Sequence, residues 1–473
     1  MHNRVRSRAR RQIPAVAKIL DGLGHCDLPR PVVVDVIRHK LSEIRVQRSV
    51  PEFESIMVLV RRSLDELRAR KLQPIINGTG IVIHTNFGRA PLPHSAICAL
   101  KEIGSAYSNL EYDLAAGGRG RRGNYVEGAL ALLFEAEAAT VVNNCAAALV
   151  LIVRHFTGTK TDVVISRGEL VQIGGGFRIG EIIEAMAAKL HEVGATNKTT
   201  VNDYARAIGP NTAMILKVHH SNFFMSGFVE SPSTGEIVAL ARKKRVPFVE
   251  DLGSGAVVAT EELGISDHEP TPTEVLKSGV DLVCFSGDKL FGGPQAGIIA
   301  GKKRLIAGLK REPLFRALRC DKLSLAALQA TVDLHLNQKT DEITTLALLQ
   351  ISEDELRDRA AAICDELSKR CSGLQIASGR STVKTGGGTM PKANLPSVTI
   401  DIVPKNSSLA DFAATLREWN PPVIGYIADD RFKLDLRTIF TDQDGLVVEA
   451  IRAAYAKDGV TTTKLTEGTK NGV

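Results

Sequence analysis

The sequence predicts an α/β protein whose main domain is a mostly parallel β-sheet covered by helices on both faces. From about residue 78, short β-branched runs alternate with alanine-rich stretches of helical periodicity. Such alternation is typical of parallel sheets with crossover helices. The chain has 473 residues, of which 44% are hydrophobic and 24% charged. This composition favours a folded protein of several domains over a disordered chain.

Seven strands are expected in the main sheet, and helices are expected between most of them. The strands are Thr140–Asn143, Asp162–Ser166, Leu190–Val193, Ala213–His219, Val246–Glu250, Leu282–Ser286 and Ala296–Ala300. The helices include Tyr125–Ala138, Ala146–Thr157, Gly235–Lys244 and Thr273–Lys277. A long helix follows near residue 320. A smaller α/β domain then carries strands at Ser397–Ile402 and Phe432–Leu436. We therefore expect domains at 1–75, 76–320 and 321–460, and a polar tail at 461–473.

The positive charge of the chain is concentrated at its N-terminus. Residues 1–71 hold 16 Lys and Arg against 8 Asp and Glu, whereas the other 402 residues together carry −1. The segment opens with a basic arm over residues 1–12. It continues with the helical stretches Ala15–Leu20, Val32–Leu41 and Phe53–Leu67. A small basic helical domain suggests a polyanionic partner, nucleic acid first, although a solvated surface fits the charge equally well.

Composition also bears on the cellular compartment. The longest apolar stretch, Cys145–Val153, is far too short to span a bilayer, and the N-terminus lacks the apolar core of a secretory signal. Seven cysteines are scattered without a C-x-x-C motif. This pattern predicts reduced thiols in a cytoplasmic enzyme, with neither a disulfide framework nor a metal site.

Three residue groups follow strands, where α/β sheets bind their ligands. Lys289 follows a buried strand and precedes several glycines, so it can lose solvation and form a Schiff base with a carbonyl cofactor. Asp251 ends another strand and could keep a pyridine nitrogen protonated. The turn Asn144-Cys145-Ala146 opens a helix and suits a phosphate group. Each feature alone is equally compatible with a solvated or capping residue. In this chain order, however, they are typical of aspartate-aminotransferase-type pyridoxal phosphate (PLP) enzymes.

Longer segments carry a more specific resemblance. They are 76–92 (INGTGIVIHTNFGRAPL), 107–122 (YSNLEYDLAAGGRGRR), 141–152, 166–179, 192–199, 218–223, 250–255, 286–297 (SGDKLFGGPQAG) and 314–322 (LFRALRCDK), with 386–391 (GGGTMP) a weaker match. Through most of its length the chain thus resembles the bacterial L-seryl-tRNA(Sec) selenium transferases.

The resemblance implies a fold type I PLP enzyme that converts seryl-tRNA(Sec) to selenocysteinyl-tRNA(Sec). Elimination of the serine hydroxyl would give an aminoacrylyl-tRNA, to which selenium from selenophosphate adds. Lys289 matches the cofactor lysine and would move the α-proton, and Asp251 falls where the carboxylate at the pyridine nitrogen should lie. The remaining implied residues are Asn144, Cys145, Ala146 and Ser286 on the phosphate side, and Asp288 for proton transfer or positioning.

Arginines are expected around the anionic selenium donor. Arg89, Arg316 and Arg319 match the family's anion pocket, and Arg119, with Arg121 and Arg122, forms a second basic loop. The resemblance also implies that the N-terminal domain grips the tRNA and that the protein is a homo-oligomer, a ring of ten in the family, without membrane attachment.

The sequence is also compatible with two alternative functions. One is a related lyase that acts on a free amino acid or an amino-sugar acid phosphate, with Arg437 holding the substrate carboxylate. The other is a catalytically silent RNA-binding scaffold, against which the intact Lys289 and Asp251 argue. His219 and His220 could line the site or simply pack, and Gln172 is a candidate for stacking on the cofactor ring.

Overall fold

A computed structural model describes residues 13–47, 49–173 and 176–467, so the basic arm 1–12 lies outside the described residues. The chain divides into two compact units. One comprises Met1–Ile75 with Ala414–Pro422, and the other comprises Ile76–Ala413 with Val423–Val473.

The part of the N-terminal segment that the structure describes, residues 13–47 and 49–75, folds as three helices: α2 (Val16–Leu23), α3 (Arg30–Arg45) and α4 (Phe53–Ala69). They cover the three stretches that helical periodicity predicted. Each helix buries one apolar stripe, and the three stripes form a separate core that includes Ile19, Ile37 and Val60. The charged side chains consequently lie on the outer faces.

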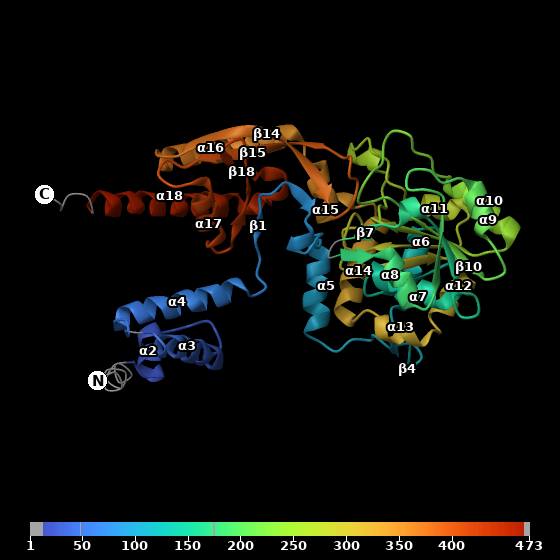
Figure 1. The fold of residues 1–473 in the computed structure, drawn as a ribbon, viewed down its shortest axis with the longest axis horizontal. Helices are drawn as coiled ribbons and strands as arrows, with labels where there is room; N and C mark the ends of the chain where they lie inside the picture. The colour runs from blue at the N-terminus through green and yellow to red at the C-terminus, as the bar shows by residue number, and fades with distance from the viewer. Residues whose placement is uncertain (1–12, 48, 174–175, 468–473) are drawn as a thin grey trace. The chain divides into compact units, whose positions relative to one another are not determined.

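The main sheet of the second unit has seven strands in the order β5-β13-β12-β11-β10-β6-β9. In chain order they are β5 (Ala138–Val142), β6 (Asp162–Ser166), β9 (Lys189–Val193), β10 (Thr212–Val218), β11 (Phe248–Gly253), β12 (Leu282–Ser286) and β13 (Gly297–Gly301). Only β13 runs antiparallel to its neighbours in this sheet. The predicted mostly parallel sheet of seven strands is therefore confirmed (Figure 1).

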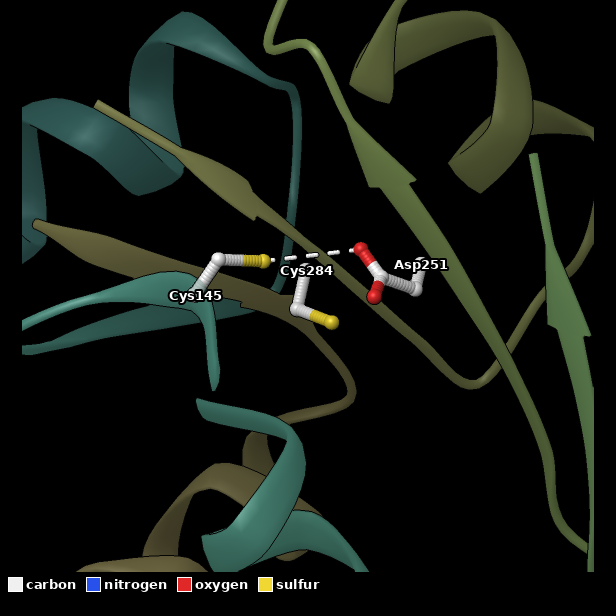
Figure 2. Close-up of side chains that lie close together, drawn as sticks. All are labelled: Cys145, Asp251 and Cys284. Atoms are coloured by element: carbon white, nitrogen blue, oxygen red, sulfur yellow. Dashed lines mark hydrogen bonds between the residues drawn. The ribbon is translucent and has the colours of Figure 1, made fainter. Parts of the chain in front are cut away.

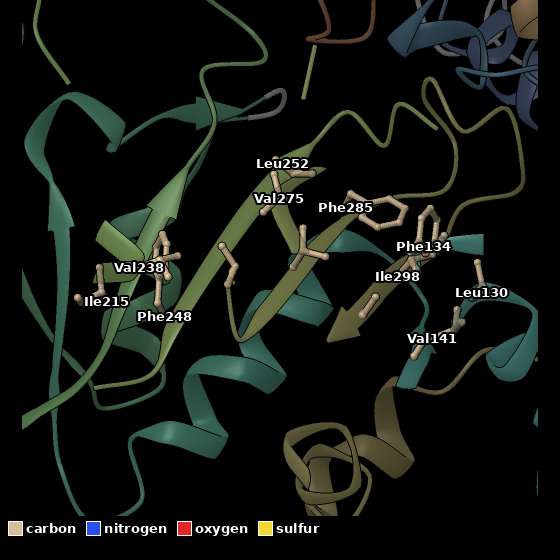
Figure 3. Packing of buried hydrophobic residues seen from close by; sticks show 14 of the residues in the cluster. Leu130, Phe134, Val141, Ile215, Val238, Phe248, Leu252, Val275, Phe285 and Ile298 are labelled. Atoms are coloured by element: carbon tan, nitrogen blue, oxygen red, sulfur yellow. The ribbon is translucent and has the colours of Figure 1, made fainter. Parts of the chain in front are cut away.

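Both faces of this sheet are buried, which explains the continuous apolar runs in its strands. Ile215 on β10 belongs to one core cluster, whereas its neighbours Met214 and Leu216 belong to the other. The first cluster (Figure 3) packs under α6 (Asn124–Leu133), α10 (Thr234–Lys244), α11 (Pro272–Ser278) and α14 (Lys322–Leu336). The second packs under α7 (Cys145–Phe156), α8 (Ile179–Ala185) and α12 (Lys303–Leu309).

Some predicted boundaries were wrong by a few residues. The helix predicted to reach Ala138 ends at Leu133, because Glu135 takes a left-handed backbone conformation (φ 52°) that turns the chain into β5. The strand predicted to end at Glu250 runs on to Gly253, so Asp251 lies within β11.

The C-terminal part contains a second sheet of five strands in the order β17-β18-β15-β14-β2. Its strands are β2 (Ile81–Ile83), β14 (Gln375–Gly386), β15 (Leu395–Val403), β17 (Tyr426–Ala428) and β18 (Arg431–Asp435). The helices α15 (Thr344–Gln350), α16 (Glu353–Arg370) and α17 (Leu409–Arg417) lie among these strands in sequence. The last helix, α18 (Asp444–Glu467), extends into the segment expected to be a polar tail.

The strand β2 ties the start of the second unit to this C-terminal sheet. It pairs in parallel with the end of β14, where Ile81 lies opposite Lys384. A shorter pair, β1 (Ile76–Asn77) with β16 (Val423–Ile424), is also parallel. Among the described residues, no helix is long and apolar enough to cross a membrane.

A buried carboxyl group lies against the main sheet. Glu169 is 2% exposed, and its Oε2 accepts a hydrogen bond from the backbone N–H of Val218 at 3.0 Å. Burial raises the pKa of Glu169 to about 8, because the charged form loses its hydration. At neutral pH the folded protein therefore favours the protonated acid.

We predict that Glu169→Gln removes a pH-dependent loss of stability. The folded-state pKa lies above the unfolded value of 4.5, so in the wild type the free energy of unfolding falls as pH rises from about 4.5 to 8. The amide oxygen introduced by Glu169→Gln would still accept the hydrogen bond from the N–H of Val218, and the amide carries no group that titrates. The free energy of unfolding of the variant should therefore rise by a few kcal/mol relative to that of the wild type between pH 5 and pH 8.5. Urea unfolding at the two pH values measures the difference. A variant with unchanged pH dependence would contradict the assignment.

Candidate active site

The carboxyl ends of three parallel strands bring the predicted site residues together. Strands β11 and β12 are paired in register, with Asp251 opposite Cys284, and Lys289 follows the end of β12. The turn after β5 lies at the same edge, because β13 joins β5 to β12. Residues that are more than 100 positions apart in sequence therefore lie together at one edge of the sheet.

The turn before α7 has the features of an anion seat. Asn144 caps the helix, and its Oδ1 accepts a hydrogen bond from the N–H of Ala147 at 2.8 Å. The first N–H groups of a helix, here those of Cys145 and Ala146, have no partner within the helix and attract negative charge. Gly297 allows this turn to lie close to β13, since a Cβ there would come within 2.1 Å of the carbonyl oxygen of Asn144.

Lys289 is buried, with 7% of its surface exposed. Burial lowers the pKa of its amine, an effect that the nearby Cys145 and Asp251 partly offset. Two glycines leave room around Nζ. A Cβ at Gly253 would lie 3.8 Å from this atom, and one at Gly388 would lie 4.0 Å from it.

Gly388 brings the C-terminal part of the chain into the site. It closes the run Gly386–Gly388, in which all three residues have a positive φ that other residues rarely adopt. In sequence this run was only a weak part of the family resemblance. Its closeness to Lys289 could not be read from the spacing, because nearly 100 residues separate the two.

Asp251 is buried beside Cys145 and is 6% exposed. Its Oδ1 accepts hydrogen bonds from the backbone N–H of Gly253 at 3.0 Å and from the thiol of Cys145 at 3.5 Å. Burial raises the pKa of this carboxyl group. Figure 2 shows Cys145, Asp251 and Cys284 side by side; their ligand-type atoms all lie within 4.8 Å of one another. Cys284 was not among the site residues predicted from the sequence, because nothing in its position marks it out within the buried strand β12.

Asp288 and Arg89 form an ion pair next to Lys289. Nη1 of Arg89 donates to both carboxylate oxygens of Asp288, at 3.1 and 2.9 Å. The backbone supports the pair, because the N–H of Ala90 donates to the carbonyl of Asp288. Arg89 itself has a left-handed backbone conformation (φ 67°), a strained state for this residue type.

A second group of arginines surrounds Glu111. Its Oε1 accepts from Nε of Arg122 at 2.9 Å and from Nη1 of Arg319 at 3.3 Å, and Arg119 lies 3.7 Å from its Oε2. The hydrogen bond from Arg122 contributes most to lowering the pKa of Glu111. Three guanidinium groups around one carboxylate leave a net positive charge. This charge lies near the turn before α7, because the N–H of Asn143 donates to the carbonyl of Leu318, the neighbour of Arg319.

Arg316 does not join this group. It is exposed on the short helix α13 (Pro313–Leu318) and makes no salt bridge to a residue that the structure describes. Arg121 is exposed as well.

The remaining candidate residues are either bound to groups outside the site or lie at its margin. Nε2 of His219 lies 3.3 Å from Oε1 of Glu269, and the ring of His220 lies 3.0 Å from the carbonyl of Gly168. Gln172 is exposed, and its Oε1 accepts from Arg178. Ser286 is buried at the end of β12, opposite Gly297.

The guanidinium group of Arg437 donates hydrogen bonds to backbone carbonyl oxygens. The residue is 2% exposed, and its two terminal nitrogens donate to the carbonyl oxygens of Leu348, Leu349, Ile351 and Pro396 at 2.5–3.2 Å. Its guanidinium group therefore holds a turn together in this structure. It does not present its terminal donors to a substrate carboxylate.

The pocket fits the PLP cofactor that the resemblance implies. A buried amine of lowered pKa, a buried carboxylate and a capped helix N-terminus are the three groups that such a cofactor needs for its aldehyde, ring nitrogen and phosphate. Lys289, Asp251 and the backbone of Cys145 and Ala146 would hold it.

Comparison with known proteins agrees with this geometry. The family model described as "SelA: L-seryl-tRNA selenium transferase" matches residues 75–440. A protein of Geotalea uraniireducens named L-seryl-tRNA(Sec) selenium transferase is 43% identical over 458 residues, which cover 93% of this chain and 98% of the relative. Relatives of the same name from Hyphomonas neptunium and Aquifex aeolicus are 44% and 40% identical, over 89% and 91% of this chain and 93% and 95% of their own.

A solved structure of D-glucosaminate-6-phosphate ammonia-lyase shares the fold, with a TM-score of 0.56 and 19% identity, over 82% of this chain and 97% of that one. At this identity the likeness concerns the fold alone. The family match spans most of the chain, and the relatives align over nearly their full lengths; the chain belongs to the L-seryl-tRNA selenium transferase family.

Proposed function

We propose that this protein converts L-seryl-tRNA(Sec) to L-selenocysteinyl-tRNA(Sec), with PLP as cofactor and selenophosphate as selenium donor. The observation that carries the proposal is the burial of Lys289 and Asp251 close together beside the α7 N-terminus. It occurs in a chain that is 43% identical, over 93% of its length, to a relative named for this activity.

Each group in the pocket has a chemical task. Bound PLP supplies an electron sink, which stabilises negative charge at the serine α-carbon while the β-hydroxyl leaves. The Asp251 carboxylate holds a proton on the ring nitrogen. Lys289 takes the α-proton at Nζ, a role for which its lowered pKa is suited, because more of the amine is neutral near pH 7.

The ion pair of Arg89 with Asp288 suggests how the anionic donor is received. Both Asp288 oxygens accept from Nη1 of Arg89, so the other nitrogens of the guanidinium group remain available to a ligand. We assign Asp288 a positioning role towards Arg89 and Arg89 a role in binding selenophosphate. Arg319 and Arg119 near Glu111 supply further positive charge for the donor or the tRNA end. Arg316 lies outside this group, and we keep it as a candidate for donor binding because it is exposed on the neighbouring helix α13.

The engagement of Arg437 disfavours the free-substrate lyase. A lyase that acts on a free amino acid would need a guanidinium group to bind the α-carboxylate of its substrate. An esterified serine has no free α-carboxylate. In this structure four carbonyl oxygens occupy the terminal donors of Arg437.

We further propose that the protein is a homo-oligomer in the cytoplasm. The segment 107–125, which contains β3 (Tyr112–Asp113), β4 (Gly118–Arg119) and the start of α6, presents Tyr107, Leu114 and Tyr125 with 106%, 75% and 58% of their surface exposed. Large apolar side chains exposed within one short segment are typical of contact surfaces. This segment also lines a groove of about 740 Å³ with α5 (His94–Gly104) and α14.

The turnover test uses purified protein with PLP, selenophosphate and seryl-tRNA(Sec). We expect selenocysteine on tRNA(Sec) and none on seryl-tRNA(Ser). Lys289→Ala should fold and yet form no product, because the proton carrier is lost. A cofactor-loaded wild type that makes no product, or an active Lys289→Ala enzyme, would contradict the proposal.

We predict that Asp288→Asn weakens use of the selenium donor. Loss of the charged hydrogen bonds costs on the order of 1.5–3 kcal/mol, so kcat/KM for selenophosphate should fall by about tenfold or more. PLP absorbance should be unchanged, because Asp288 is not among the groups assigned to the cofactor. Asp288→Glu, which keeps the charge, should recover part of the loss. Equal effects of Asn and Glu would argue against positioning of Arg89.

We predict that α3 contacts the tRNA backbone. Arg30, Arg38 and Arg45 are exposed and fall within one arc of this helix, given 100° per residue. Changing all three to Gln should weaken tRNA binding and lower the slope of log K against log salt by roughly one unit per lost phosphate contact. Binding at several salt concentrations measures this slope.

The matched control changes three exposed cations of the large domain, Lys243, Lys244 and Lys303, to Gln. It should leave the slope close to that of the wild type. Equal slopes for the two triple variants would mean that the N-terminal helices are not the main tRNA contact.

A further inference from the structure

The cluster of Cys145, Asp251 and Cys284 has the composition of a metal-binding site. Two sulfur atoms and a carboxylate oxygen lie within 4.8 Å of one another, although the three residues come from a helix start and two different strands. Figure 2 shows both thiols on the same side of the Asp251 carboxylate. The sequence predicted no metal site, because the two cysteines are 139 positions apart.

The separation between one sulfur and one oxygen of the cluster suits a tetrahedral zinc ion. With Zn–S of about 2.3 Å and Zn–O of about 2.0 Å, a sulfur and an oxygen ligand should lie about 3.5 Å apart. Sγ of Cys145 lies 3.5 Å from Oδ1 of Asp251. Three protein ligands with a fourth position for water form a common open zinc site.

A divalent cation would also lower the electrostatic cost of this cluster. Zn²⁺ compensates two of the three negative charges carried by two thiolates and one carboxylate, and such pairing reduces the cost of placing charges in a buried site.

We propose that the cofactor-free protein binds a thiophilic divalent cation, such as Zn²⁺, through Cys145, Cys284 and Asp251. The two thiol protons pass to solvent on binding, and no electron transfer is involved. Because the proposed function assigns Asp251 to the ring nitrogen of PLP, the ion and the cofactor would compete for one carboxylate.

The first test is zinc binding to full-length protein that has been stripped of cofactor and kept reduced. A chromophoric zinc indicator reports the free ion. We expect about one tight site per chain, and at least tenfold weaker binding in both Cys145→Ala and Cys284→Ala. The control is His268→Ala, which removes an exposed histidine beside Glu261 and Glu274, an ordinary surface site for zinc. Loss of the tight site in His268→Ala, or its survival in both cysteine variants, would overturn the proposal.

A second measurement does not depend on variants. Co²⁺ added to the same wild-type protein should give the near-ultraviolet charge-transfer absorption of thiolate ligation and the intense visible bands of a tetrahedral ion. Their absence would overturn the proposal even if a cysteine variant failed to fold.

Competition tests the link to the cofactor. PLP added to the zinc-loaded protein should release the ion to the indicator, and retention of zinc at full PLP occupancy would refute the shared use of Asp251. These titrations contain neither tRNA nor selenophosphate, so their failure is distinguishable from failure of the turnover assay.

Discussion

The parallel pairing of β11 with β12, which is in register up to Asp251, is the constraint on which the rest of the site depends. It sets Asp251 opposite Cys284 and directs the chain after β12 so that Lys289 enters the same pocket. Successive side chains of a strand point to opposite faces of the sheet. A shift of the β11 register by a single residue would therefore turn the Asp251 side chain to the other face. Both faces are fully packed, and this packing makes such a shift costly.

Close backbone approach is the second requirement of the architecture. Gly297 lets the turn before α7 rest against β13, and Gly388 carries a distant loop to within reach of Lys289. Both positions exclude larger residues for steric reasons. The pocket is thus assembled from rigid strand ends and from loops whose closeness to them depends on the absence of side chains.

Burying a carboxylate and an amine in one pocket costs free energy unless partners compensate. Burial raises the pKa of Asp251 and lowers that of Lys289, which are the shifts expected of charges with too little hydration. A protonated ring nitrogen or a metal cation would each relieve this cost for Asp251. The chemistry proposed for the cofactor and the binding proposed for zinc therefore rest on the same electrostatic property.

Sequence patterns predicted the strands that are specified by residues adjacent in the chain. Strands such as Asp162–Ser166 and Leu282–Ser286 were predicted to the residue, because both faces are buried and the apolar run is unbroken. The twelve-residue β14 was missed, since its polar residues give no such run and it is specified by pairing with β15.

Contacts between distant segments were beyond the reach of sequence patterns. The resemblance placed Asp288 and Arg89 in the site, yet only the fold shows that they bind each other. Likewise, no spacing rule could unite Cys145 with Cys284, and the engagement of Arg437 with four carbonyls depends on segments 41 to 89 residues away.

The pairing of β2 with β14 affects how the chain can fold during its synthesis on the ribosome. Ile81 is synthesised 303 residues before Lys384, the residue opposite it in the sheet. During this interval the strand has no native partner in that sheet, and long-range pairings of this kind slow folding and leave apolar edges open to association. The run Gly386–Gly388 emerges later still, so a nascent chain that already contains Lys289 does not yet enclose it. Completion of the pocket must therefore follow translation of the C-terminal sheet, which would keep the reactive amine from acting before the enzyme is whole.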